Sequence, residues 1–287
     1  GSRSISLSKC GVAFSSDIPT ATANISAQVT VNGVDLVWTQ DPAFTASEYS
    51  LFRGVSGNSF NLIGKTAALT FTDPEYSTEG NLCYRISYVD ACDNLSPPSI
   101  DACPIRLSGN LLSDNSIDLS WSDYTGWENG VLEYTIEKYD QNGNLISSTS
   151  TGTTTTFNDN VQDLNNQIYV YVIYATATDV GVIESISNTI TIIKEPKLYY
   201  PGAFTPNGDG LNDQFTVIGQ YVAKFDMKIF NRWGELIFST TDLLKGWNGE
   251  FNGQPQPEGT YTFTATLRDK TGKSHKRDGS VMLLRKK

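Results

Sequence analysis

The chain has 287 residues, a length that predicts two or three domains at about 100–150 residues each. Charged residues make up 18% of the chain and aromatic residues 11%, and serine and threonine are abundant, a composition that favours β-strands over helices. The sequence contains no run of about 18 apolar residues and no charged-then-apolar leader. It therefore predicts neither a transmembrane span nor a signal peptide within these residues.

The net charge of −10 is unevenly distributed along the chain. Residues 1–195 contain 8 basic and 22 acidic side chains, whereas residues 196–287 contain 13 basic and 9 acidic ones. The acidic front part disfavours nucleic acid or an anionic membrane as a partner, because both are negatively charged themselves. The single histidine, His275, lies among lysines and arginines, which is typical of a solvated residue in a basic turn. No enzymatic activity is predicted, since no other histidine is present to serve a hydrolytic triad. Carboxylate-only chemistry, as in glycosidases, stays open with 31 acidic residues, but their spacing singles out no pair.

An internal repeat extends over residues 22–194. Three segments of the first copy recur in the second at offsets that rise slowly from 83 to 87, namely Val34–Trp38 as Ile117–Trp121, Glu48–Leu51 as Glu133–Ile136, and Tyr84–Ile86 as Tyr171–Ile173. Within each copy, apolar and polar residues alternate with period two between regularly spaced turns, which predicts half-buried strands. The tryptophan on the second strand and the tyrosine-rich later strand resemble the fibronectin type III sandwich.

We therefore expect an all-β protein of three tandem antiparallel β-sandwiches, two of them fibronectin type III-like and the C-terminal one immunoglobulin-like. The expected boundaries are a lead-in segment of residues 1–21, repeat modules of residues 22–107 and 108–195, and a C-terminal domain of residues 196–287.

Four cysteines lie in the first part of the chain. In an exported β-protein they predict two disulfides, and their spacing does not match a C-x-x-C metal site. Strand pairing around a turn near Asp93 would place Cys83 opposite Cys103 and leave Cys92 at the end of the sandwich where Cys10 arrives. We therefore expect the disulfides Cys83–Cys103 and Cys10–Cys92.

The segment after Pro196 contains several ordered motifs: Phe204-Thr205-Pro206-Asn207-Gly208-Asp209-Gly210-Leu211-Asn212-Asp213-Gln214-Phe215, Ile229-Phe230-Asn231-Arg232-Trp233-Gly234, Pro257-Glu258-Gly259-Thr260-Tyr261-Thr262-Phe263 and Gly279-Ser280-Val281-Met282-Leu283-Leu284-Arg285. Together they resemble the gliding-motility-associated C-terminal sorting domain, the type B signal of the Bacteroidetes type nine secretion system. The resemblance covers residues 198–287. It implies that this domain directs a passenger across the outer membrane to the cell surface or beyond, with translocon components and an outer-membrane barrel as partners.

The loop from Phe204 to Phe215 is the expected recognition element, with the residues Phe204, Thr205, Pro206, Asn207, Gly208, Asp209, Gly210, Asn212, Asp213 and Phe215. Two interpretations of its polar side chains remain open. Asn207, Asp209 and Asp213 are spaced like the first half of an EF-hand loop, which suits calcium, although the later bidentate carboxylate is absent. Alternatively, these side chains bond their own backbone in a glycine turn, with Phe204 and Phe215 anchored in the core. No other cofactor is expected.

The C-terminal hairpin is rich in bases: Arg268, Lys270, Lys273, Lys276, Arg277, Arg285, Lys286 and Lys287. These residues either guard a solvated strand edge or form a docking patch whose affinity for a partner falls with salt. A second hairpin is expected around Asn231–Glu235, where Gly234 takes the positive φ that the turn requires.

The tryptophans Trp127, Trp233 and Trp247 would suit sugar binding if they were exposed, and core packing if they were buried. The sequence as a whole predicts the C-terminal fragment of a secreted or cell-surface, adhesin-like protein, monomeric in isolation, whose last domain is its export signal. The alternatives are a carbohydrate-binding or adhesion module and the accessory tail of a secreted hydrolase.

Overall fold

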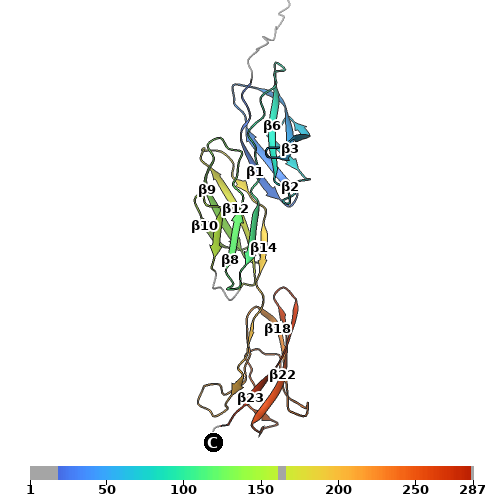
Figure 1. The fold of residues 1–287 in the computed structure, drawn as a ribbon, viewed down its shortest axis with the longest axis vertical. Helices are drawn as coiled ribbons and strands as arrows, with labels where there is room; N and C mark the ends of the chain where they lie inside the picture. Colours follow the sequence, from blue (N-terminus) through green and yellow to red (C-terminus); the bar gives the residue numbers. More distant parts are fainter. Residues whose placement is uncertain (1–18, 161–165, 286–287) are drawn as a thin grey trace, which may run out of the picture. The chain divides into compact units, whose positions relative to one another are not determined.

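The computed structural model describes residues 19–160 and 166–285, which form strands, turns and loops without a helix. Because no helix is present in these residues, none is available to span a membrane. The chain divides into two compact units: unit 1 comprises residues 1–159 and 170–191, and unit 2 comprises residues 160–169 and 192–287. Figure 1 labels the principal strands of both, and the predicted all-β fold of sandwich type is confirmed.

The first repeat has two sheets built from six strands: β1 (Ala23–Thr30), β2 (Gly33–Thr39), β3 (Ala46–Val55), β4 (Phe60–Thr66), β5 (Thr70–Asp73) and β6 (Leu82–Asp90). One sheet has the order β1-β2-β5 and the other β4-β3-β6. Because side chains alternate across a strand, Leu36, Trp38, Tyr84 and Ile86 all point into the buried space between the sheets.

The second repeat uses eight strands: β7 (Leu107–Leu111), β8 (Ile117–Trp121), β9 (Val131–Tyr139), β10 (Leu145–Ser150), β11 (Thr156–Asp159), β12 (Ile168–Ala177), β13 (Ser185–Ile186) and β14 (Ile190–Ile193). Its sheets have the orders β11-β8-β7 and β10-β9-β12-β13, with β14 also paired to β12. These orders correspond to β5-β2-β1 and β4-β3-β6 of the first repeat, so the repeated sequence folds into a repeated layout.

A polar triad that is mostly buried occurs at equivalent positions in both repeats. In each, an aspartate at the end of a short strand accepts hydrogen bonds from a cation on a central strand and from a tyrosine hydroxyl. The distances are 2.9 Å for Arg53–Asp73 and 2.7 Å for Tyr84–Asp73, and 2.8 Å for Lys138–Asp159 and 2.6 Å for Tyr171–Asp159. In each triad the aspartate has an opposite charge and a hydroxyl donor as partners. Such partners offset the free-energy cost of removing a carboxylate from water.

The two repeats share one continuous sheet in unit 1. Strand β13 of the second repeat pairs in parallel with β1 of the first, with Ile186 opposite Gln28, and the resulting order is β10-β9-β12-β13-β1-β2-β5. Trp127 Nε1 donates to Ser26 Oγ at 3.1 Å, and the hydroxyl of Tyr124 donates to the carbonyl of Ile25. The repeats are therefore joined along strand edges as well as through the chain, and the module boundaries given above stay predictions.

Unit 2 is organised around one five-stranded sheet. Its strands are β15 (Leu198–Tyr199), β16 (Ala203–Phe204), β17 (Ile218–Gly219), β18 (Val222–Phe230), β19 (Leu236–Thr240), β20 (Glu250–Phe251), β21 (Gln254–Pro255), β22 (Gly259–Asp269) and β23 (Ser274–Leu283). The sheet has the order β16-β23-β22-β18-β19, and β15-β17 and β20-β21 form two small pairs. Figure 1 labels β18, β22 and β23 of this sheet. Its core includes Phe215, Trp247 and the inward residues Tyr261, Phe263 and Leu267 of β22.

Candidate recognition site

The loop from Phe204 to Phe215 is anchored at both ends in the core of unit 2. Both phenylalanine side chains are fully buried, and their rings lie 5.4 Å from Trp247 for Phe204 and 5.1 Å from Phe263 for Phe215. Backbone hydrogen bonds of 2.9 and 3.0 Å join Phe215 and Trp247 in both directions. The chain between the two anchors is consequently fixed at its ends while its central residues are exposed.

Inside this loop, Asp213 acts as an acceptor for several backbone N–H groups. Its Oδ1 accepts from Asn207 at 2.9 Å and Gly208 at 2.7 Å, and its Oδ2 accepts from Gly210 at 2.8 Å. These hydrogen bonds, above all those from Gly208 and Gly210, hold the pKa of Asp213 below its usual range. Asp209 also bonds the loop backbone, since its Oδ1 accepts the N–H of Leu211 at 2.8 Å.

This geometry corresponds to the second interpretation of the loop, in which the polar side chains bond their own backbone. The oxygens of Asp213 point toward N–H groups, whereas a bound cation would need them directed at one common point. Within residues 19–160 and 166–285, no three or more His, Cys, Asp or Glu side chains group in a way that could hold a metal ion. A calcium role for Asn207, Asp209 and Asp213 has no support from this arrangement and remains only a prediction.

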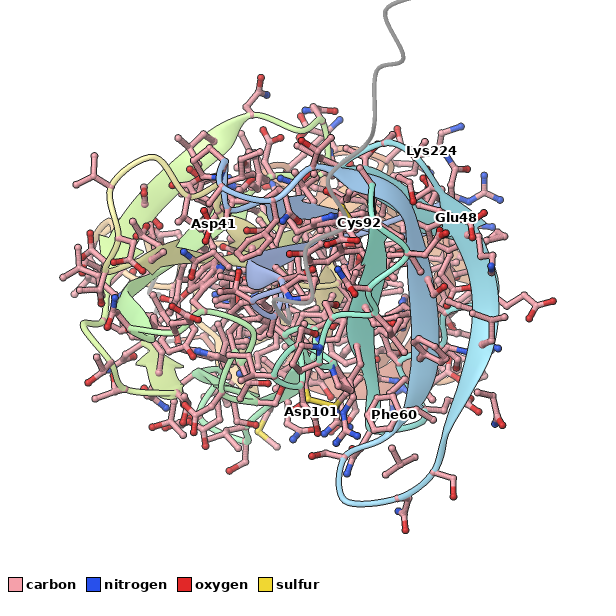
Figure 2. The ribbon with its side chains drawn as sticks, turned by 90° about the horizontal axis from the view of Figure 1, so that it is seen from above. Asp41, Glu48, Phe60, Cys92, Asp101 and Lys224 are labelled. Atoms are coloured by element: carbon pink, nitrogen blue, oxygen red, sulfur yellow. A yellow bond between two sulfur atoms is a disulfide. The ribbon has the colours of Figure 1, made fainter. Side chains whose placement is uncertain are left out.

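The predicted disulfide Cys83–Cys103 is present (Figure 2). Tyr84 and Ala102 exchange two backbone hydrogen bonds, of 2.8 and 2.9 Å, so the neighbouring residues Cys83 and Cys103 face each other in the closely spaced type of antiparallel pair. Figure 2 draws it as a yellow bond beside Asp101. Cys92 lies in the turn after β6, but Cys10 lies outside the described residues, so the second disulfide stays a prediction.

The basic patch is carried by the β22–β23 hairpin and the segment after it. Arg268 lies near the end of β22, Lys270 and Lys273 in the turn, and Lys276 and Arg277 on β23. Lys276 pairs with Asp278 at 3.1 Å and Lys273 with Glu195 at 3.9 Å, and all four of these side chains are more than half exposed. Exposed pairs of this kind add about 0–1 kcal/mol to stability, so these lysines are not needed for folding.

Arg285, Lys286 and Lys287 are the three remaining members of the predicted patch. Arg285 donates from Nη2 to the carbonyls of Gly249 at 3.2 Å and Gln256 at 3.3 Å, which gives it a structural role. Lys286 and Lys287 lie outside the described residues.

The prediction that His275 is a solvated residue of a basic turn is wrong. His275 belongs to β23, its side chain is 13% exposed, and its Nε2 lies 2.9 Å from Oδ2 of the buried Asp269. The prediction failed because the neighbouring lysines suggested a turn, whereas the turn is displaced to residues 270–273 and His275 enters the strand on its partly buried face.

The three tryptophans considered for sugar binding do not form one exposed surface. Trp127 and Trp247 are buried, and Trp247 Nε1 donates to the carbonyl of Glu250 at 2.8 Å. Trp233 alone of the three is exposed, at the tip of the hairpin between β18 and β19. A row of indole rings on an open face, which the carbohydrate-binding alternative needs, is not formed by these residues.

Comparison with known proteins gives one family match. Residues 198–283 match the family described as the CHU_C Type IX secretion signal domain. No curated protein matches the chain. Among solved structures, a tetra-tandem repeat in the extending region of a large adhesion protein is 14% identical, with a TM-score of 0.32, over 92% of this chain and 74% of that chain. The FN1–FN3 domains of chicken CNTN1 are 10% identical, with a TM-score of 0.25, over 93% of this chain and 99% of that chain.

The matched residues begin at β15 and end with β23, so they cover the whole five-stranded sheet, the anchored loop and the hairpin tip of Trp233. A signal domain of this type indicates export to the cell surface or the extracellular space. Residues 198–283 thus match the CHU_C Type IX secretion signal domain, and the chain carries this sorting signal of a secreted protein behind two β-sandwich repeats.

Proposed function

We propose that the type IX export machinery recognises the folded signal domain through the loop from Phe204 to Phe215, and that the basic patch strengthens this binding by charge. The observation that carries the proposal is the construction of the loop. Its ends are buried, its interior is held by Asp213, and its central residues are exposed. A loop ordered before binding loses little conformational entropy when a partner binds it.

In this proposal the partners are translocon components and an outer-membrane barrel, and the isolated chain is monomeric. The two repeats form the part of a surface adhesin that precedes the signal. The sheet that the two repeats share supports a role as a spacer, because a shared sheet resists bending between modules better than a single linker does. Catalysis is not part of the proposal, since sorting requires only that the signal be bound.

The test places residues 1–287 behind a reporter with its own periplasmic leader, in a host with the type IX machinery. Removal of the whole loop would also remove Phe204 and Phe215 from the core, so the better variant replaces only residues 206–213 with a Gly-Ser sequence. We expect this variant to accumulate in the periplasm, with the reporter still folded. Export at the wild-type level would move recognition to another surface of the domain.

A single substitution, Asp213→Ala, tests the same loop with less disturbance. It removes the acceptor for three backbone N–H groups, so the exposed segment should lose its fixed conformation and export should fall several-fold. Asp242→Ala is the matched control, because the carboxylate of Asp242 accepts the N–H of Leu244 in a similar turn, at 2.9 Å. Equal loss in both variants would indicate general destabilisation instead of a recognition defect.

A further inference from the structure

A pocket in unit 2 lies where two loops meet: the turn Asn231–Glu235 and the segment Gln256–Tyr261 that leads into β22. It has a volume of about 280 Å³, near the roughly 300 Å³ at which ligand pockets begin. Trp233 forms part of its wall and is 77% exposed, whereas each of the other four tryptophans of the chain is at most 6% exposed. Trp233 is therefore the tryptophan whose ring is accessible to a partner.

The turn that presents Trp233 is fixed by its own hydrogen bonds. Asn231 Oδ1 accepts the N–H groups of Trp233 and Glu235, both at 3.0 Å, and Asn231 Nδ2 donates to Glu235 Oε2 at 2.9 Å. Gly234 takes a φ of 81°, as the sequence predicted, and closes the turn with a 3.0 Å bond to the Asn231 carbonyl. The exposed ring is therefore held on a rigid support.

The opposite wall is equally constrained. The hydroxyl of Tyr261 donates to the Pro257 carbonyl at 2.7 Å, and the backbone N–H of Arg285 donates to Glu258 Oε1 at 2.5 Å. The guanidinium of Arg285 bonds the Gln256 carbonyl from outside the pocket lining. Both walls are thus ordered without a ligand, which lowers the entropic cost of binding one.

Two large side chains of the pocket take no part in these internal bonds. The ring of Trp233 offers apolar surface, and the guanidinium of Arg232 stacks on it with its carbon 4.7 Å from the ring centroid. In the described part of the chain, the Arg232 guanidinium makes no hydrogen bond and no ion pair. The pocket thus combines the apolar indole ring of Trp233 with the N–H donors of the Arg232 guanidinium. This combination suits a ligand in which a carboxylate lies next to an apolar group.

We infer that this pocket, built around Arg232 and Trp233, binds a peptide segment of the export machinery in which a carboxylate lies beside an apolar side chain. The inference rests on the proposed function and adds a second contact surface to it. The net charge of +4 of residues 196–287 also favours an acidic partner. Tryptophan and arginine are the residues that most often dominate the binding energy of protein interfaces.

A peptide fits these groups better than a glycan does. Sugar sites surround the aromatic ring with polar side chains that are available to hydroxyl groups. Here the amide of Asn231 is used within the turn, Glu258 accepts from Arg285, and Tyr261 donates to Pro257. Thr260, which carries a hydroxyl, also lines the pocket. The two largest groups, the guanidinium of Arg232 and the indole of Trp233, match a carboxylate and an apolar side chain.

The test measures binding of the purified full chain to outer-membrane fragments from a host with the type IX machinery. Co-sedimentation of the chain with the fragments measures binding for every variant, including Trp233→Ala. We expect Trp233→Ala to weaken binding by roughly 30-fold, the effect of losing one strong interface residue. Arg232→Glu should weaken it as much by repelling the carboxylate, and Arg232→Lys should fall between it and wild type.

Leu244→Ala is the matched control, since Leu244 is an 88% exposed apolar residue of the same unit outside this pocket, and it should bind like wild type. Wild-type binding by Trp233→Ala would overturn the inference and leave the proposed function intact. Binding that survives protease treatment of the fragments would also overturn it, in favour of a glycan. Equal binding of the wild-type chain to fragments from a strain without the machinery would instead refute the proposed function.

Discussion

Asp269 is a carboxylate that unit 2 buries almost completely. Its Oδ1 accepts from the hydroxyl of Thr271 at 2.6 Å and its Oδ2 lies 2.9 Å from His275 Nε2 and 3.1 Å from Gln167 Nε2. Burial alone would raise the pKa of Asp269, but these hydrogen bonds, the largest from Thr271 and His275, outweigh burial and hold it well below its usual range.

This low pKa makes the stability of unit 2 sensitive to acid. Because the folded pKa lies below the unfolded value of about 3.9, the contribution of Asp269 is complete above pH 4 and is lost as the pH falls further. Asp269→Asn keeps the size but removes the charge, and should cost about 1–3 kcal/mol at pH 7. Denaturant unfolding at pH 7 and pH 3 measures both effects.

Other carboxylates titrate in the same window, so the difference between wild type and Asp269→Asn is the quantity to compare. That difference should shrink from pH 7 to pH 3. A difference that stays constant with pH would show that the side chain acts through its shape alone.

The disulfide Cys83–Cys103 is the second feature with a measurable effect at the scale of single residues. It joins positions 20 residues apart, and a closed loop of this length restricts the unfolded chain by about 3 kcal/mol. The double variant Cys83→Ala with Cys103→Ala should lose about that much stability in denaturant unfolding. Any further destabilisation of this variant by a thiol reductant would report the predicted disulfide Cys10–Cys92.

At the scale of strands, the pairing of β1 with β13 of the second repeat joins the two repeats of unit 1 into one continuous sheet. Gly126 lies at the junction of the repeats, with a φ of 130°, and its carbonyl accepts the N–H of Ile25 at 2.9 Å. A Cβ on Gly126 would lie 2.8 Å from the Ile25 carbonyl oxygen and 2.9 Å from Ala102 Cβ. Only glycine permits so close an approach of the two repeats.

Gly126→Ala should therefore destabilise unit 1 by about 1–3 kcal/mol through overpacking, in addition to about 1 kcal/mol of backbone strain. Gly130→Ala is the control, because Gly130 also has a positive φ, of 71°, but no atom lies within 4 Å of its added Cβ. The free energies of unfolding of the two variants, measured with denaturant, separate the cost of backbone strain from the cost of overpacking at the junction. Equal losses would show that the close approach contributes nothing.

At the scale of the whole molecule, the separation of charge is the dominant feature. Residues 1–195 carry 22 acidic and 8 basic side chains, while residues 196–287 carry 13 basic and 9 acidic ones. An acidic partner would be attracted by the signal domain and repelled by the repeats, which orients the chain during encounter. Lys273 and Lys276 can contribute to this attraction, because their own ion pairs are exposed and weak.

Binding to outer-membrane fragments should consequently weaken as sodium chloride rises from 50 to 500 mM, since exposed charges are screened over about 10 Å at 0.1 M and about 3 Å at 1 M salt. A variant with Lys270, Lys273 and Lys276 changed to glutamine should bind more weakly at low salt and show a smaller salt dependence. Lys65→Gln, in unit 1, is the control and should behave like wild type. Salt-independent binding would exclude the basic patch from recognition.

Much of this protein was determined by local sequence patterns. Period-two alternation predicted the strands, the slow drift in offset revealed the repeat, and the motifs after Pro196 identified the signal domain. The disulfide Cys83–Cys103 and the turn at Gly234 could also be predicted, because each depends on antiparallel pairing between segments at most 20 residues apart.

Tertiary structure decided the features that depend on contacts between distant segments. The pairing of β13 with β1 joins residues about 160 positions apart, and no local pattern encodes it. His275 looked solvated among lysines until strand pairing placed it against Asp269. Trp233 and Trp247 occur in similar glycine-rich contexts, yet one is exposed and the other fully buried. Burial depends on which segments the fold brings together, and for that reason the pocket around Arg232 and Trp233 appears only in three dimensions.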